Sequence, residues 1–551
     1  MYVYDSYDHQ FITERIAQYR GQLGRYLLGE LSEEEFLPLR LQNGIYIQRL
    51  APMMRIAIPY GQVSAKQLRA LADIARRFDK GYIHATTRQN VQLNWPRLED
   101  TADILAALAA VEMHAIQTSG NCVRNTTTDQ YAGVAMDEVE DPRPWCEIIR
   151  QWSTGHPEFM FLPRKFKIAV CGSEEDRAAF LFHDIGLQLV HRRDEVRGFK
   201  IFVGGGLGRT PMIGVCIRNF LPQQHLLTYL DAILRVYNRY GNRQNRDKAR
   251  IKILVKAWTP AVFAQRVEEE WAHLKNGSTT LTVEEIERMM AFFNGSDYQI
   301  IDDVTEMEQL REIADGDRAF SRWLARNVVH QKQPGYAAVA LSLKPAGVAP
   351  GDLTDVQLNA IADLSDTFAQ GEIRTTHNQN MVIVDVVKSK LYAFWQTAKR
   401  FGLATPNIGT LTDIICCPGR DYCSLANAKS IPIAEDIQRR FDDLDYVHDL
   451  GDLELNISRC MNACGHHHVG HIGILGVDKK GLEWYQIQLG GSANKSAALA
   501  KVLGPSLSRN DVIDAIENIL NVYVERRHEH ESFLSTVQRI GIDTFKQRVY
   551  G

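Results

Sequence analysis

The 551-residue sequence predicts an α+β protein built as a tandem duplication, in which each half holds a small unit followed by a larger one. Two observations predict this class. Three segments of the first half recur in the second half at nearly constant separation. Helical and strand periodicities also follow one another in each half without a regular βαβ series. The length itself accommodates roughly three to four domains.

The longest recurrence pairs residues 68–93 with residues 358–383, without a gap, at a separation of 290. Two shorter matches follow in the same order, at separations of 287 and 286: residues 183–190 with 470–477, and residues 199–206 with 485–492. Three collinear matches at nearly one separation are difficult to obtain by chance, so we interpret them as an internal duplication.

Each half is expected to begin with a strand, continue through an amphipathic helix to a second strand, and then enter a larger segment with a helical end. The first strand is expected at residues 53–59 in one half and 336–343 in the other. The predicted boundaries are an N-terminal helical extension at 1–42, small units at 43–110 and 331–400, larger units at 111–268 and 401–551, and a helical connection at 269–330.

Composition excludes several classes of function. The net charge of −4 gives no overall attraction to nucleic acid or acidic membranes, so neither is an expected partner. Apolar runs of the length needed for a signal peptide or a membrane span are not found. Nine cysteines, an odd number gathered in groups, do not form a disulfide framework, and a cytoplasmic location is expected.

The cysteine groups indicate a redox or metal site. Cys417 and Cys423 have five residues between them, and Cys460 and Cys464 have three. Zinc knuckles and thioredoxin-like motifs use closer pairs, whereas four thiolates in two pairs suit a 4Fe–4S cluster. Two pairs of buried core thiols remain the alternative, and a disulfide is less consistent with the cytoplasm. The cysteines that belong to no such motif are Cys122, Cys146, Cys171, Cys216 and Cys416.

These cysteine motifs, with "MMRIAIP", "TTRQNVQ", "NCVRNTTT", "LPRKFKIAV", "VGGGLG" and "HNQN" in order, resemble the sulfite and nitrite reductases that use siroheme and a 4Fe–4S cluster. The chain is most similar to the assimilatory sulfite reductase haemoprotein. The resemblance implies ferredoxin-like small units, larger mixed α/β siroheme-binding units and pseudo-two-fold symmetry. It also implies that Cys417, Cys423, Cys460 and Cys464 bind the cluster, and that the Cys464 thiolate is shared with the siroheme iron.

The resemblance implies four anion-contacting groups, all in the first half: Arg55, Arg124, Lys165 and Lys167. The run "LPRKFKIAV" is expected to be a strand, so that Lys165 and Lys167 share one face. Two ammonium groups about 7 Å apart on one face repel unless an anion lies near them. Other residues are expected to line or bind the cofactor: Arg88, Gln89, Asn90, Gly204, Gly205, Gln379 and Asn380.

The function implied by the resemblance is six-electron reduction of sulfite to sulfide, with reduction of nitrite to ammonia as the alternative. Nitrite-reducing members of the family often carry asparagine at the position of Lys167, and lysine suits the sulfite dianion better. Arg209 interrupts any dinucleotide fingerprint in "VGGGLG", so electrons are expected from a partner protein, a ferredoxin or a flavoprotein. Two other classes, an iron–sulfur electron carrier and a zinc-stabilised binding protein, remain open.

One departure from the family pattern needs explanation. Cys464 is followed by "GHHHVGH", which contains His466, His467, His468 and His471 where the family shows other polar and small residues. We expect these histidines to form hydrogen bonds or packing contacts near the cofactor; a separate metal site is the alternative.

Overall fold

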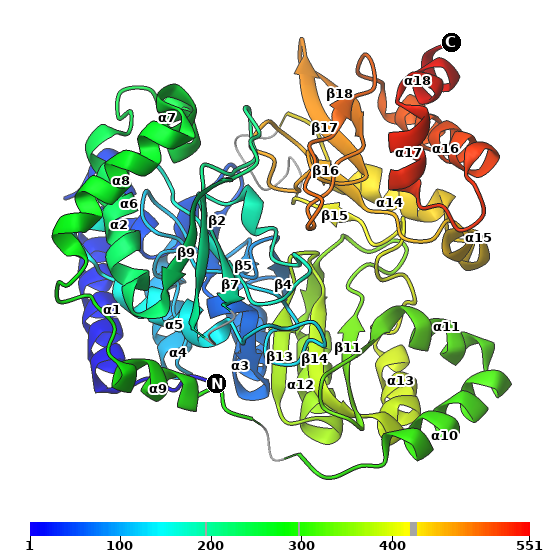
Figure 1. Ribbon diagram of the computed structural model, residues 1–551, viewed down its shortest axis with the longest axis horizontal. Helices are drawn as coiled ribbons and strands as arrows, with labels where there is room; N and C mark the ends of the chain where they lie inside the picture. The colour runs from blue at the N-terminus through cyan, green and yellow to red at the C-terminus, as the bar shows by residue number, and fades with distance from the viewer. Residues whose placement is uncertain (193–195, 296–297, 419–426) are drawn as a thin grey trace.

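The computed structural model describes residues 1–192, 196–295, 298–418 and 427–551 (Figure 1). Cys423 therefore lies outside the described residues. Within these ranges the strands form four sheets, two in the small units and two in the larger units. No helix of the described ranges is long and apolar enough to cross a membrane.

The two small units each contain a five-stranded sheet in which the first-half and second-half strands are mixed. One sheet has the order β1 (Ile45–Ile47), β2 (Pro52–Ile56), β5 (Val91–Leu93), β4 (Tyr82–Ala85) and β12 (Asp352–Thr354). The other has the order β10 (Val328–His330), β11 (Tyr336–Leu341), β14 (Met381–Val387), β13 (Glu372–Thr375) and β3 (Gln62–Ser64).

Each half thus donates one short strand to the sheet of the other. Strand β12 pairs antiparallel with β4, and β3 pairs antiparallel with β13. The register pairs Asp352 with His84 and, 290 residues away in each strand, Gln62 with Arg374. The identical register confirms the duplication and shows that the halves are interlocked, which the sequence pattern did not reveal.

The larger units repeat one topology. The first has the order β6 (Ile168–Cys171), β7 (Ile185–His191), β8 (Arg197–Val203) and β9 (Val215–Pro222). The second has the order β15 (Ile415–Cys416), β16 (Leu455–Ser458), β17 (Ile472–Lys479), β18 (Leu482–Leu489) and β19 (Lys501–Val502). In both units a parallel pair, β6 with β7 or β16 with β17, leads into an antiparallel hairpin.

Two equivalent helices join the small units. Helices α3 (Ala65–Phe78) and α12 (Asp355–Phe368) each begin with a capping box, formed by Ser64 with Gln67 and by Thr354 with Gln357. Both follow an exchanged strand directly, and they pack against each other. A single hydrophobic core consequently runs through both small units.

The remaining helices cover the sheets. They are α1 (Ser6–Leu27), α2 (Glu33–Gln42), α4 (Thr101–Ala109), α5 (Arg143–Ser153), α6 (Leu226–Tyr240), α7 (Ile251–Trp258), α8 (Pro260–Leu274), α9 (Val283–Ala291), α10 (Asp303–Gly316), α11 (Arg318–Asn327), α13 (Leu391–Arg400), α14 (Ile431–Arg440), α15 (Leu444–Asp449), α16 (Arg509–Arg526), α17 (Phe533–Ile540) and α18 (Asp543–Tyr550). Figure 1 shows the second larger unit above the small unit of its half, with α16–α18 on its outer side, and the first larger unit to the left.

One sequence expectation needs correction. The strand predicted in "LPRKFKIAV" begins only at Ile168, so Lys165 and Lys167 lie in the segment before β6. The segment expected as a helical connection between the halves contains α9, α10 and α11, and its helices pack in two cores. Ile286 and Met289 of α9 pack in the first larger unit, whereas Phe320 and Trp323 of α11 pack in the small-unit core.

Candidate active site

A cavity lies between the two halves and is lined from both of them. It encloses about 1330 Å³, counting the part that opens to solvent. The first half contributes Arg55, Arg88, Arg124, Lys165, Lys167 and Arg250; the second contributes Cys417, Arg459, Cys464 and His466. No aspartate or glutamate is among the described residues that line it. The cavity is therefore strongly cationic in a protein of slightly negative net charge.

Backbone pairing brings the four predicted anion-contacting groups together. Arg55 lies on β2. Residues 122–124 run beside residues 165–167, because the Arg124 N–H donates to the Phe166 carbonyl at 2.8 Å and the Phe166 N–H donates to the Cys122 carbonyl at 3.0 Å. Phe166 is fully buried in the core, and the two flanking lysines face the cavity. The alternation expected of a strand is thus present without regular strand structure.

Arg124 and Arg88 are held by neutral acceptors. The Arg124 guanidinium donates to the carbonyls of Thr118 (2.6 Å) and Gly120 (2.6 Å and 3.1 Å). Arg88 donates to the Asn125 carbonyl at 2.6 Å and to Thr127 Oγ1 at 3.0 Å. These contacts orient both side chains without neutralising their charge.

Burial lowers the pKa of both lysines that line the cavity. Burial lowers the pKa of Lys165 to about 7, with Cys464 opposing the shift and Arg250 and Arg124 adding to it. Burial likewise lowers the pKa of Lys167 well below its ordinary value, and neighbouring Arg88 adds to this shift. A bound anion would remove the repulsion and return these groups to their charged forms.

The thiols face the cations across the cavity. Burial alone would raise the pKa of Cys464, but nearby Lys165 and Arg459 outweigh it, and the thiolate is favoured. Although Cys464 lies deep between the halves, its side chain is accessible from the cavity. The Arg459 N–H donates to Cys417 Sγ at 3.3 Å, and Thr87 Oγ1 donates to the Cys464 carbonyl at 2.8 Å.

These residues fit an iron cofactor with many carboxylates. The first half forms a cationic wall of the cavity from Arg55, Arg88, Arg124, Lys165, Lys167 and Arg250. No described carboxylate lies on the cavity surface, so a polyanionic ligand would compensate the charge of this wall. Cys464 and Cys460 lie close enough to Cys417 to raise the pKa of its thiol, an effect that adds to that of burial. Across the described ranges, no three potential ligands are gathered tightly enough to hold a single metal ion. A 4Fe–4S cluster takes one thiolate at each iron, and so tolerates wider spacing.

Not every predicted cofactor residue reaches the cavity. Arg88, Asn90, Gln379 and Cys464 line it, whereas Gln89, Asn380, Gly204 and Gly205 do not. A Cβ on Gly205 would lie 2.2 Å from the Leu181 carbonyl oxygen, so close backbone packing explains this glycine. Gln89 and Asn380 are buried in contacts between segments. Cys416 packs in the core of the second larger unit, and Cys417 faces the cavity.

Some contacts made by the cavity residues had no sequence signal. Arg250 lines the cavity while pairing with buried Asp184 at 2.7 Å, a pair separated by 66 residues. Arg459 could have been suspected only because it directly precedes Cys460. Two of the histidines form hydrogen bonds of the expected kind: His468 contacts the Gly208 carbonyl at 3.0 Å, and His471 Nδ1 accepts the Glu454 N–H at 3.2 Å. His466 lines the cavity, and neither ring nitrogen of buried His467 has a hydrogen-bond partner among the described residues.

An interlocked α+β duplication, with a thiolate from one half facing a cationic wall from the other, defines a metal-cofactor oxidoreductase acting on small anions. Residues 48–111 and 330–400 match the nitrite/sulfite reductase ferredoxin-like half domain, and residues 119–275 and 409–551 match the nitrite and sulphite reductase 4Fe-4S domain. The chain belongs to this nitrite and sulphite reductase family. The match confirms the expected cofactors, siroheme and a 4Fe–4S cluster, and the expected fold class.

The relatives include reductases of both anions. A sulfite reductase (ferredoxin) of Mycobacterium tuberculosis is 28% identical over 90% of this chain and 83% of the relative. A ferredoxin–nitrite reductase of Synechococcus elongatus is 28% identical over 87% of this chain and 88% of the relative. The solved structure of the Mycobacterium tuberculosis NirA protein has a TM-score of 0.76 and 25% identity, covering 94% of this chain and 92% of that one.

Proposed function

We propose that this chain reduces sulfite to sulfide in six one-electron steps, with a ferredoxin as electron donor. The observation that carries the proposal is the convergence of Arg55, Arg124, Lys165 and Lys167 on the cavity that exposes Cys464. The names of the mycobacterial relatives, sulfite reductase (ferredoxin), support both the substrate and the donor. A flavoprotein donor remains the second candidate.

The cationic residues hold the oxyanion and supply protons. Arg55 and Arg124 would orient the sulfur–oxygen bonds by donating hydrogen bonds. Lys165, whose pKa lies near 7, can exchange a proton at its Nζ near neutral pH. Lys167, adjacent in the same wall, would donate in the same way once an anion has raised its pKa.

The second half holds the electron-transfer group. We propose that Cys417, Cys423, Cys460 and Cys464 bind the cluster, with the Cys464 sulfur also facing the siroheme. When bound, these cofactors supply single electrons and the iron at which the substrate is reduced. Arg88, Asn90 and Gln379 would contact siroheme from the cavity wall. Arg459 from the second half would balance thiolate charge, because it already opposes the burial shift of Cys417.

Nitrite is the alternative substrate, and one observation favours sulfite. Arg55, Arg124, Lys165 and Lys167 are four of the seven cationic side chains among the described residues that line the cavity, and a doubly charged anion compensates such a cluster better than a singly charged one. The nitrite reductases among the relatives indicate that the scaffold accommodates either chemistry.

The test compares turnover of the two anions by the purified holoenzyme with one reduced ferredoxin. Sulfite should have the higher kcat/KM, and Lys167→Gln should lower it at least about tenfold, the loss expected for one charge-assisted contact. Lys66→Gln, at an exposed position on α3, is the matched control and should leave turnover unchanged. A higher kcat/KM for nitrite would reassign the substrate.

We also propose a cytoplasmic location and the unit boundaries expected from the repeat pattern. Cys122, Cys146 and Cys171 are buried thiols without a disulfide, which suits a reducing compartment. The exchanged strands imply that the two small units form one folding unit, and the larger units are separable cores.

A further inference from the structure

Gln89 and Gln379 occupy equivalent positions in the two halves and are held in an unusual conformation. They are 0% and 1% exposed, and their φ angles are +56° and +59°, a region that residues other than glycine rarely adopt. Each follows a strand of its small-unit sheet, β4 or β13. A conformation repeated 290 residues apart indicates a constraint common to both halves.

Gln89 connects the cationic segment, residues 124–128 with Arg124 at their start, to the opposite half. Its Nε2 donates to the Thr375 carbonyl on β13 at 3.2 Å. Its Oε1 accepts the Thr128 N–H at 3.1 Å. Thr128 lies four residues after Arg124, on the segment that forms part of the cationic wall.

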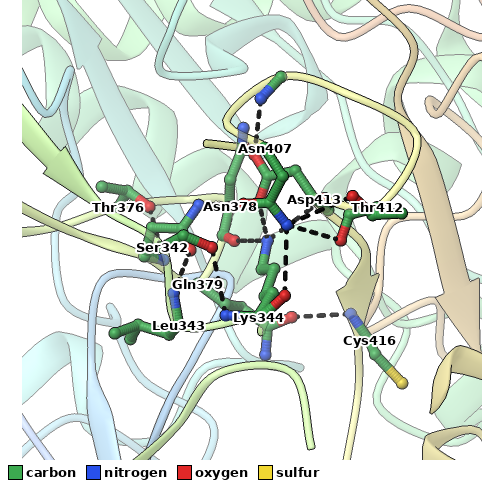
Figure 2. A network of polar contacts seen from close by, with 12 residues as sticks. Ser342, Leu343, Lys344, Thr376, Asn378, Gln379, Asn407, Thr412, Asp413 and Cys416 are labelled. Carbon is green, nitrogen blue, oxygen red and sulfur yellow. Dashed lines mark hydrogen bonds and ion pairs between the residues drawn. The ribbon is translucent and has the colours of Figure 1, made fainter. Parts of the chain in front are cut away.

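Gln379 repeats the arrangement with the halves exchanged. Its Nε2 donates to the Ala85 carbonyl on β4 at 2.9 Å. Its Oε1 accepts the Cys416 N–H at 2.8 Å, as Figure 2 shows. Cys416 directly precedes Cys417, so this bond holds the segment that carries the first proposed cluster thiolate.

A glycine lies directly against the side-chain amide of each glutamine. Gly61 and Gly351, also 290 residues apart, have φ angles of +81° and +85°. A Cβ on Gly61 would lie 2.7 Å from Gln89 Nε2, and one on Gly351 would lie 3.0 Å from Gln379 Nε2. Thr375 Oγ1 additionally donates to the Gln89 carbonyl at 2.8 Å. Both glutamine side chains are therefore enclosed by backbone and fixed by hydrogen bonds, which leaves them little freedom to move.

We propose that Gln89 and Gln379 are positioning residues that fix the cationic segment and the cluster-binding segment relative to each other. Each glutamine ties one functional segment to the strand end of the opposite half. Together they set the separation between the substrate-binding charges and the thiolates. The roles of the two segments, anion binding and cluster binding, rest on the proposed function. Their positions relative to each other rest on the hydrogen bonds described above.

The symmetry makes each glutamine the matched control for the other. An amide that served only to join the halves would give similar defects at both positions. Positioning residues give different ones, because Gln89 holds the cationic segment and Gln379 holds the cluster segment. Substitution by glutamate separates the two bonds at each site: it keeps the acceptor for the segment N–H and removes the donor to the opposite strand.

The experiment uses the holoenzymes of Gln89→Leu, Gln379→Leu, Gln89→Glu and Gln379→Glu. We measure the midpoint potential and EPR g-values of the cluster, and the sulfite affinity by optical titration. Gln379→Leu should shift the cluster signals. Gln89→Leu should leave them unchanged and weaken sulfite binding about tenfold, as the loss of one positioning hydrogen bond predicts. Each glutamate variant should fall between its leucine variant and wild type.

Equal effects of both leucine variants on both readouts would overturn the inference, as would unchanged readouts in both. If a leucine variant fails to fold, the glutamate variant at that position decides the outcome by the same criteria. Failure of the proposed function is separate: wild-type enzyme would then not reduce sulfite, whatever the variants do to the cluster signals.

Discussion

The buried ion pair between Lys344 and Asp413 supports the cluster-binding segment, and its removal allows a quantitative test. Lys344 Nζ lies 2.6 Å from Asp413 Oδ1, and the two side chains are 0% and 2% exposed. The same ammonium also donates to the Asp413 carbonyl at 3.3 Å and to the Asn378 carbonyl (Figure 2). Asp413 Oδ2 accepts the Gly409 N–H at 2.9 Å, and Asn380 Nδ2 donates to Oδ1 at 2.9 Å.

The perturbations are Lys344→Met, Asp413→Asn and the double variant. Either single change leaves a buried charge without its counter-ion, at a cost of about 3–5 kcal/mol. The double variant removes both charges and should cost at least about 2 kcal/mol less than the sum of the single variants. The control pair is Arg548–Glu525, in the same larger unit, at 2.7 Å with side chains 43% and 48% exposed, where Glu525→Gln should cost below about 1 kcal/mol.

The assay is native-state hydrogen exchange of the amides in β15 and β16, because a chain with several cores does not unfold in one step. It reports the free energy of opening for the sheet that leads into Cys417. Single-variant costs no larger than that of the exposed control pair would refute the reasoning. So would additive costs, because they would mean that the two charges do not interact.

Three further predictions concern the site. Cys464→Ser should remove the siroheme and cluster absorption bands together, because we propose that Cys464 both binds the cluster and faces the siroheme; retention of both bands would contradict this double role. Burial lowers the pKa of Lys165 to about 7 in the folded protein. Between about pH 7 and pH 10 the unfolded chain therefore binds more protons at this lysine than the folded chain does, and the Tm of cofactor-free protein should rise with pH across this range. Lys165→Met should flatten that rise, and an equal rise in the variant would exclude Lys165 as its source. Gly465→Ala should abolish cluster incorporation, because its Cβ would lie 1.9 Å from the Ile457 carbonyl oxygen. Gly21→Ala, with no atom within 4 Å, is the control, and equal cluster content in both variants would refute this steric argument.

The sequence pattern predicted those parts of the fold that depend on local periodicity and on repetition. The constant separation near 290 identified the duplicated units because helices α3 and α12 bury the same face. The exchange of β3 and β12 could not be predicted, because three-residue strands carry little periodicity and their partners lie in the other half. The early start predicted for β6 was wrong because alternation continues through the irregular segment before Ile168.

The site was predicted where motifs mark it. Arg55, Arg124, Lys165 and Lys167, the four residues that the resemblance named, line one cavity, and residues 122–124 pair with residues 165–167 beside it. Their contact with the anion stays a prediction. The Arg250–Asp184 pair was not predicted because its members lie far apart in the chain and match no motif. Gln89 and Gln379 were both expected to line the cofactor; Gln379 lines the cavity and Gln89 does not. The carbonyl that each side-chain amide contacts could not be predicted from the sequence.

The most direct test of the account is the stoichiometry of anaerobic turnover: the electrons taken from reduced ferredoxin for each sulfide released from sulfite. The account predicts six electrons for each sulfide, with siroheme and cluster absorption bands present in the purified protein. Holoenzyme that consumes ferredoxin electrons without releasing sulfide, or that forms only ammonia from nitrite, would contradict it.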